Sequence, residues 1–228
     1  MSIRGTITYS TRGAPVRTVP ELDVKIRQVC VECNGRWLHD LERAFRSVML
    51  LPMNGFGPIA MSKPVQLVVA LWAAKTSWLI ERSVGYIRGE QAPDAGPSPF
   101  RWMRERSEPP PQTQVWIGAV DAKPAKLISF VATQWVGADD PPVGIVQVFS
   151  IGYLLFVLYS PVGFSHLPMP TQTFALSIEG GTANFLREIW PHKTDEVEWP
   201  PPGIFSADQL EVMWPSGGRI RAKFAPPE

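Results

Sequence analysis

The spacing of apolar residues changes once along this chain, and that change limits the folds open to it. Between about residues 37 and 83, apolar side chains recur every three or four residues, as they do on one side of an α-helix. After Thr113 they alternate with other side chains or form short runs bounded by Pro, Asp and Gly, which is typical of β-strands. Helices followed by strands predict an α+β fold whose second part is a mostly antiparallel β domain.

Two helices are expected in the first part. The first covers residues 37–51, and its apolar positions form one stripe: Leu38, Leu41, Phe45 and Val48. The second covers residues 62–83 with Ser62 as N-cap, and its apolar surface is wide enough to be buried on more than one side. Because Lys75 lies within that surface, we expect its ammonium to be snorkelling or paired rather than catalytic.

Residues 89–112 separate the two patterns and are rich in proline, glycine and charged side chains. This composition predicts a linker or a long surface loop. The chain therefore divides into an N-terminal part (1–88), this segment (89–112) and a strand-rich part (113–228). Within the last part, strands are expected near 113–122, 126–137, 144–152, 153–160 and 172–179, and a short helix at 206–214 begins with a capping-box pattern, Ser206 and Gln209.

Composition and charge exclude some classes of function. With 228 residues, 45% of them apolar, the chain can bury a core without disulfides or metal, and its net charge of +1 gives no global attraction to nucleic acid. Residues 143–159 approach the length of a membrane span, about 18 residues, but their valines, aromatics and glycines favour buried strands with a turn near Gly152. We expect no membrane partner. Because no apolar leader is visible, we expect a cytoplasmic protein.

The only two cysteines lie in the stretch CVECNGRW, residues 30–37. A closed structural zinc site needs four ligands, usually as two pairs, and Cys30 and Cys33 supply one pair. The histidines of the chain do not provide the second pair at zinc-finger spacing. Two alternatives remain: a zinc knuckle remnant completed in a homodimer by the same cysteines of a second chain, or two buried thiols without metal.

Basic side chains recur along the first helix at spacings of three, four and three residues: Arg36, His39, Arg43 and Arg46. This spacing places them on one side of the helix, where the arginines could contact DNA phosphates. The alternative is an ordinary solvent-facing surface whose charge is offset by Asp40 and Glu42. The stretch RWMRER, residues 101–106, combines basic and aromatic side chains and is a weaker indication of nucleic-acid contact.

Residues 29–42, VCVECNGRWLHDLE, resemble the C-terminal arm of the HNH endonuclease motif. They are most similar to a bacterial and phage subgroup with the pattern C-x-x-C-N-x-G-W-M-x-x-L-E. Residues 70–81, ALWAAKTSWLIE, resemble the helix that follows the motif in that subgroup. A more general likeness extends over most of the chain from about Val19.

The resemblance implies a ββα-metal nuclease. In this family a histidine activates the attacking water, and one divalent ion such as Mg²⁺ or Mn²⁺ stabilises the leaving oxygen. It further implies that Cys30 and Cys33 are the second zinc pair, and that Asn34 takes the last motif position beside the catalytic metal. Trp37, Leu41 and Glu42 match positions on the helix that packs against the finger.

The chain departs from the family pattern upstream of Cys30. Residues 1–29 contain no histidine and no cysteine, so the first C-x-x-C and the general-base histidine are missing. Gly35-Arg36 also stand where the subgroup tends to have Asn-Gly. Three explanations remain open: the half-site has been lost, the recorded start lies inside a longer reading frame, or the likeness is only architectural.

The reading favoured by these residues is a degenerate or truncated HNH-endonuclease-like protein, without catalysis in this chain, that binds DNA through Arg36, Arg43 and Arg46. One alternative is an active metal-dependent DNA endonuclease in which His39 replaces the missing base. Another is a non-enzymatic interaction protein of phage or prophage origin whose strand-rich part carries the binding surface.

Overall fold

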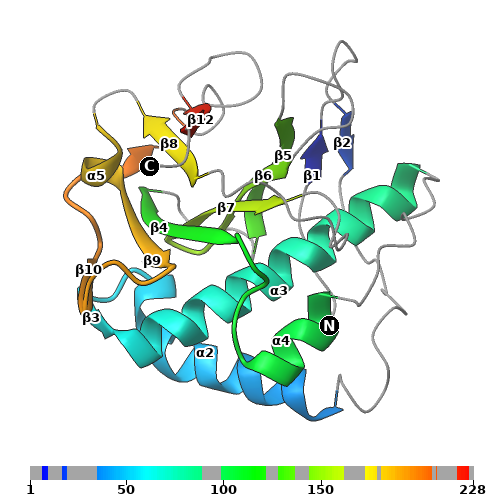
Figure 1. The fold of residues 1–228 in the computed structure, drawn as a ribbon. Helices are drawn as coiled ribbons and strands as arrows, with labels where there is room; N and C mark the ends of the chain where they lie inside the picture. The colour runs from blue at the N-terminus through cyan, green and yellow to red at the C-terminus, as the bar shows by residue number, and fades with distance from the viewer. Residues whose placement is uncertain are drawn as a thin grey trace.

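The fold combines helices with antiparallel sheets, which confirms the predicted α+β class (Figure 1). The computed structural model describes residues 7–9, 17–19, 35–88, 99–121, 128–136, 144–161, 173–178, 181–206, 209 and 220–225. In these residues the helices are α2 (Trp37–Met53), α3 (Lys63–Arg88), α4 (Pro99–Arg106) and α5 (Thr182–Phe185).

The largest sheet has the strand order β11-β4-β7-β6-β5, and β9 also pairs with β4. All of its pairings are antiparallel except the short one between β11 and β4. Its strands are β4 (Gln114–Asp121), β5 (Ile128–Val136), β6 (Gly144–Ile151), β7 (Leu154–Pro161), β9 (Leu186–Trp190) and β11 (Phe205–Ser206). Among the described residues, three two-stranded sheets join β1 (Ile7–Tyr9) to β2 (Arg17–Val19), β3 (Ile59–Ser62) to β10 (Glu196–Trp199), and β8 (Thr173–Ile178) to β12 (Ile220–Ala225).

The helices and strands expected from the apolar spacing are present, with ends that differ by a few residues. The apolar segment 143–159 forms β6 and β7, which are joined by a tight turn at Gly152-Tyr153. The turn lies where the sequence predicted it, because Gly152 adopts a positive φ of 57° that other residues adopt only with strain. In the part of the chain that the structure describes, no helix is long and apolar enough to cross a membrane.

Helices α2 and α3 pack against one face of the large sheet through aromatic side chains. The rings of Phe45 and Trp72 are stacked with centroids 3.8 Å apart, and Phe149 and Phe156 of the sheet pack against Trp72. Truncating a buried ring of this kind typically costs about 3–5 kcal/mol, so these contacts fix α2 firmly on the molecule. The same hydrophobic core contains residues from both the 1–88 and the 113–228 parts of the chain.

Part of the segment 89–112 differs from the predicted loop, because residues 99–106 form helix α4. The side chain of Met103 is completely buried, and Phe100 packs against the core. On the outside of the helix, Arg101 and Glu105 form an i,i+4 ion pair of 2.8 Å. The helix forms because two apolar side chains one turn apart gain burial against the core, which the proline-rich and charged composition conceals.

The described residues do not show the ββα arrangement of a nuclease finger. A hairpin of β1 and β2 precedes α2 in the chain, but β1 lies beside β5 of the large sheet (Figure 1). The segment 20–34, which would join the hairpin to the helix, lies outside the described residues. The finger remnant therefore stays a prediction.

The predicted capping box at Ser206 is confirmed. The Ser206 backbone N–H donates to Gln209 Oε1 at 2.9 Å, and the Gln209 backbone N–H donates to Ser206 Oγ at 3.1 Å. These reciprocal bonds satisfy two amides at a helix start. The rest of the helix predicted over 206–214 falls outside the described residues, apart from Gln209 itself.

Candidate nucleic-acid interface

Helix α2 has one buried side and one solvent-facing side. Its buried stripe enters the core between α3 and the sheet: Leu38, Leu41, Phe45 and Met49. The basic residues lie on the other side and are all exposed: Arg36, His39, Arg43 and Arg46. The structure therefore brings the predicted phosphate contacts together on one accessible surface, called here the basic face.

Asp40, an acidic residue on the basic face, forms only a weak ion pair with Arg43. Arg43 Nη2 lies 2.9 Å from Asp40 Oδ1, and the two side chains are 74% and 62% exposed. An ion pair this exposed contributes about 0–1 kcal/mol, because water screens the charges and both side chains lose rotamer freedom. A phosphate oxygen can therefore replace the Asp40 carboxylate as the partner of Arg43 at small cost.

The second acidic residue of α2, Glu42, is neutralised from inside the protein. Lys75 of α3 is 1% exposed and forms a hydrogen-bonded ion pair with the Glu42 carboxylate. Its ammonium also lies 5.2 Å from the centroid of the Trp72 ring. The prediction that Lys75 is paired is confirmed, and Glu42 contributes little negative charge to the surface.

Burial sets the protonation behaviour of Lys75. Removal from water lowers the pKa of the Lys75 ammonium, while the charge of Glu42 and its hydrogen bond raise this pKa. Nearby Arg46 lowers it slightly further. The effect of burial is the largest, so the pKa of Lys75 is lowered overall. The protein interior disfavours the charged ammonium, and the Glu42 carboxylate is the group that favours it.

The remaining predicted site residues divide into two groups. Cys30, Cys33 and Asn34 lie outside the described residues, so the zinc pair and the Asn34 metal position stay predictions. His39 is exposed on α2 beside the arginines. Among the described residues, no three His, Cys, Asp or Glu side chains lie close enough together to hold a metal ion.

Comparison with protein-family models, curated proteins and solved structures gave no match. The likeness to HNH endonucleases therefore stays a prediction from the sequence, based mainly on the residues at 29–42 and 70–81. In the structure residues 37–42 of the first stretch begin α2, and the second stretch forms the middle of α3. The two stretches contact each other through the ion pair of Glu42 and Lys75.

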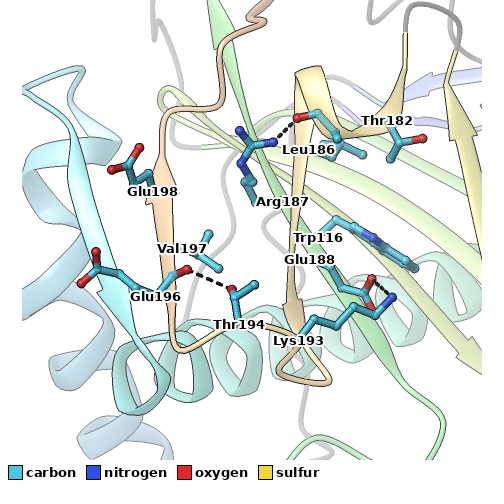
Figure 2. Close-up of a pocket in the computed structure, with 11 residues that line it drawn as sticks. Trp116, Thr182, Leu186, Arg187, Glu188, Lys193, Thr194, Glu196, Val197 and Glu198 are labelled. Atoms are coloured by element: carbon cyan, nitrogen blue, oxygen red, sulfur yellow. Dashed lines mark hydrogen bonds and ion pairs between the residues drawn. The ribbon is translucent and has the colours of Figure 1, made fainter.

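A second candidate site was not predicted from the sequence. A cavity of about 440 Å³ lies between β9 and β10, and Figure 2 shows the side chains around it. The acidic lining residues are Glu188, Glu196 and Glu198. The stretch EVEW, residues 196–199, could have indicated one side of this cavity from the sequence. Its alternation of acidic and apolar residues predicts a strand with one acidic side and one buried side.

Proposed function

We propose that this chain is a degenerate or truncated HNH-endonuclease-like protein that binds double-stranded DNA through the basic face of α2 and does not catalyse cleavage by itself. One observation carries the proposal: Arg36, Arg43 and Arg46 are all exposed on the part of the α2 surface that its buried stripe leaves free. The likeness of residues 29–42 to the HNH motif supports DNA as the anion.

The dimensions of the basic face suit a DNA backbone. From Arg36 to Arg46 the helix rises about 15 Å at about 1.5 Å per residue. One DNA strand places a phosphate about every 3.4 Å along its axis, so this length spans roughly four phosphates. Because α2 is fixed by the Phe45–Trp72 stack, the arginines do not need a folding step before they bind. Such contacts predict sequence-independent, salt-dependent binding.

The triple variant Arg36→Gln/Arg43→Gln/Arg46→Gln is expected to weaken DNA binding at every salt concentration. Each lost phosphate contact lowers the magnitude of the slope of log K against log salt by about 0.9, so the slope should fall by about 2–3. Fluorescence anisotropy of a labelled DNA duplex, titrated with protein at several salt concentrations, measures both quantities.

The matched control replaces three cations that lie away from α2 and outside the stretch 101–106, Lys63, Arg187 and Lys193, by Gln. This control removes the same charge and should leave the salt slope close to that of the wild-type chain. Equal effects of the two triple variants would assign binding to net charge rather than to α2. If the wild-type chain does not bind the duplex, the proposed function is wrong.

Purified chain is expected not to nick plasmid DNA above the EDTA control in Mg²⁺ or Mn²⁺. The reason is chemical: Asn34 offers a metal one neutral oxygen and no base, and His39 lies on the helix rather than on the strand that carries the family's base. Agarose-gel conversion of supercoiled to open-circular plasmid measures the activity. Metal-dependent nicking that His39→Ala or Asn34→Ala abolishes would instead establish the active endonuclease.

An observation at the end of α2 favours a non-enzymatic interaction protein, with a contact surface on the N-terminal part of the chain rather than on the strand-rich part expected from the sequence. Leu50, Leu51 and Phe56 are 50%, 63% and 67% exposed, which is unusual for large apolar side chains so near to one another in sequence. A chain that is folded but shows no DNA binding in the anisotropy assay would favour this alternative.

A further inference from the structure

The cavity lies between two strand edges that face each other without being paired. Strands β9 and β10 follow one another in the chain, but β9 pairs with β4 and β10 pairs with β3. Figure 2 shows the two strands side by side with the cavity between them. On the sides that face the cavity, neither strand has a ladder partner among the described residues. We call this space the β9–β10 groove.

Buried contacts hold the groove open at its floor. The indole Nε1–H of Trp199 in β10 donates to the Gly118 carbonyl oxygen of β4 at 2.7 Å. Trp116, Leu186 and Val197, which line the groove, are each less than 6% exposed. Because Trp199 ties β10 to β4, the strand on the far side of the groove cannot simply move across to pair with β9. The groove is therefore a preformed site of the size that proteins use for ligands.

The rim of the groove is acidic. Glu196 and Glu198 alternate along β10, are both exposed and form no ion pair with any described residue. On the β9 side, Glu188 Oε2 lies 2.6 Å from Lys193 Nζ, whereas Glu188 Oε1 is buried and accepts no hydrogen bond from the described residues. The other cation of β9, Arg187, donates to the Ala183 carbonyl oxygen. This bond to a neutral carbonyl leaves the Arg187 charge without a carboxylate partner, so the lining carries three carboxylates against two cations, a net charge of −1. The excess negative charge lies on β10, where Glu196 and Glu198 attract cations.

We propose that the β9–β10 groove binds an extended peptide segment that carries lysine or arginine at alternate positions, by strand addition to the free edge of β10. The Glu196 carbonyl oxygen accepts a hydrogen bond of 2.9 Å from Thr194 Oγ1, which a peptide N–H would replace (Figure 2). The other unpaired backbone groups of β10 would pair with the peptide backbone, as in other cases of β-strand addition. Residues opposite one another on paired strands point to the same side of a sheet, so basic residues at positions i and i+2 of the peptide would meet Glu196 and Glu198. This site does not depend on the proposed DNA binding, because it uses other elements and the opposite charge.

The test uses the full chain and a capped pentapeptide, acetyl-Val-Lys-Val-Lys-Val-amide, followed by chemical shifts of the backbone amides. We expect saturable shifts centred on β10 and no binding of the matched peptide with Glu in place of Lys. The double variant Glu196→Gln/Glu198→Gln should weaken binding about 3- to 10-fold, the range expected when two solvent-exposed ion pairs are lost.

Two controls make the result decisive. Glu108→Gln/Asp121→Asn removes the same charge from exposed positions outside the groove and should leave the affinity unchanged. Methylation of alternate peptide nitrogens removes backbone donors but keeps the lysines, so it should abolish binding if a strand is added. Absence of saturable binding, equal weakening by both double variants, or undiminished binding of the methylated peptide would each overturn the proposal.

Discussion

Glu42→Gln is expected to lower the free energy of unfolding by about 2–4 kcal/mol at neutral pH. The change leaves the Lys75 ammonium, which is 1% exposed, without the carboxylate that compensates its burial. Breaking a buried ion pair by removing one partner usually costs about 3–5 kcal/mol, and the partial exposure of Glu42 lowers that figure. Urea unfolding followed by tryptophan fluorescence measures the difference.

The pH dependence of this effect has a definite sign. The pKa of Lys75 is already lowered from 10.5 in the folded protein, and Glu42→Gln removes the interactions that raise it. Between the folded pKa and 10.5 the unfolded chain binds more protons than the folded chain, so stability increases with pH in that window. The electrostatic cost of Glu42→Gln should therefore be full below the folded pKa of Lys75 in the variant, which lies below that of the wild-type protein. It should shrink as the pH rises from there and be gone at the folded pKa of the wild-type lysine, because above it Lys75 is neutral in both folded proteins.

The double variant Glu42→Gln/Lys75→Met separates lost pairing from general damage to α2. Methionine fills a similar volume without a charge, so most of the lost stability should return. Glu196→Gln, at an exposed carboxylate with no ion-pair partner among the described residues, should change stability by less than about 0.5 kcal/mol. If Glu42→Gln alone leaves the stability unchanged, Lys75 is not held as a buried cation.

Gly152→Ala should destabilise the protein by about 2–5 kcal/mol. This figure is the sum of two costs, the strain of a left-handed backbone conformation at a non-glycine residue and the strain of an overpacked contact. Gly152 has φ +57° in the turn between β6 and β7, and a Cβ there would lie 2.0 Å from the Met53 carbonyl oxygen at the end of α2. That oxygen also accepts a hydrogen bond of 3.1 Å from the Tyr153 backbone N–H. The added methyl group must therefore separate the turn from α2, and thermal or urea unfolding would detect the loss.

Gly57→Ala is the matched control for this contact. Gly57 also has a positive φ, +75°, but a Cβ at this position meets no atom within 4 Å. Its substitution should cost only the backbone strain, about 1–2 kcal/mol. Equal losses for the two variants would mean that the turn at Gly152 does not pack against the end of α2 in solution.

The spacing of apolar and polar residues along the sequence determined much of the secondary structure of this protein. Helical periodicity predicted α2 and α3, alternation predicted β4 to β8, and the pair Ser206 and Gln209 predicted the capping box. The same periodicity placed Arg36, Arg43 and Arg46 on one face of α2, because the angle between residues of a helix is set by its own backbone. The basic face could therefore be predicted before any tertiary contact was known.

Only the tertiary structure decided which distant groups meet. The partner of Lys75 is Glu42, on another helix, and β3 pairs with β10 although more than half of the chain separates them. Met103 is buried although its neighbours are charged, because α4 packs its apolar side on the core. The β9–β10 groove exists because each strand pairs on its other side. The pattern of residues along a helix or strand determines which of its sides is apolar. Packing between distant segments determines what that side contacts, and it also determines which strand edges are left unpaired.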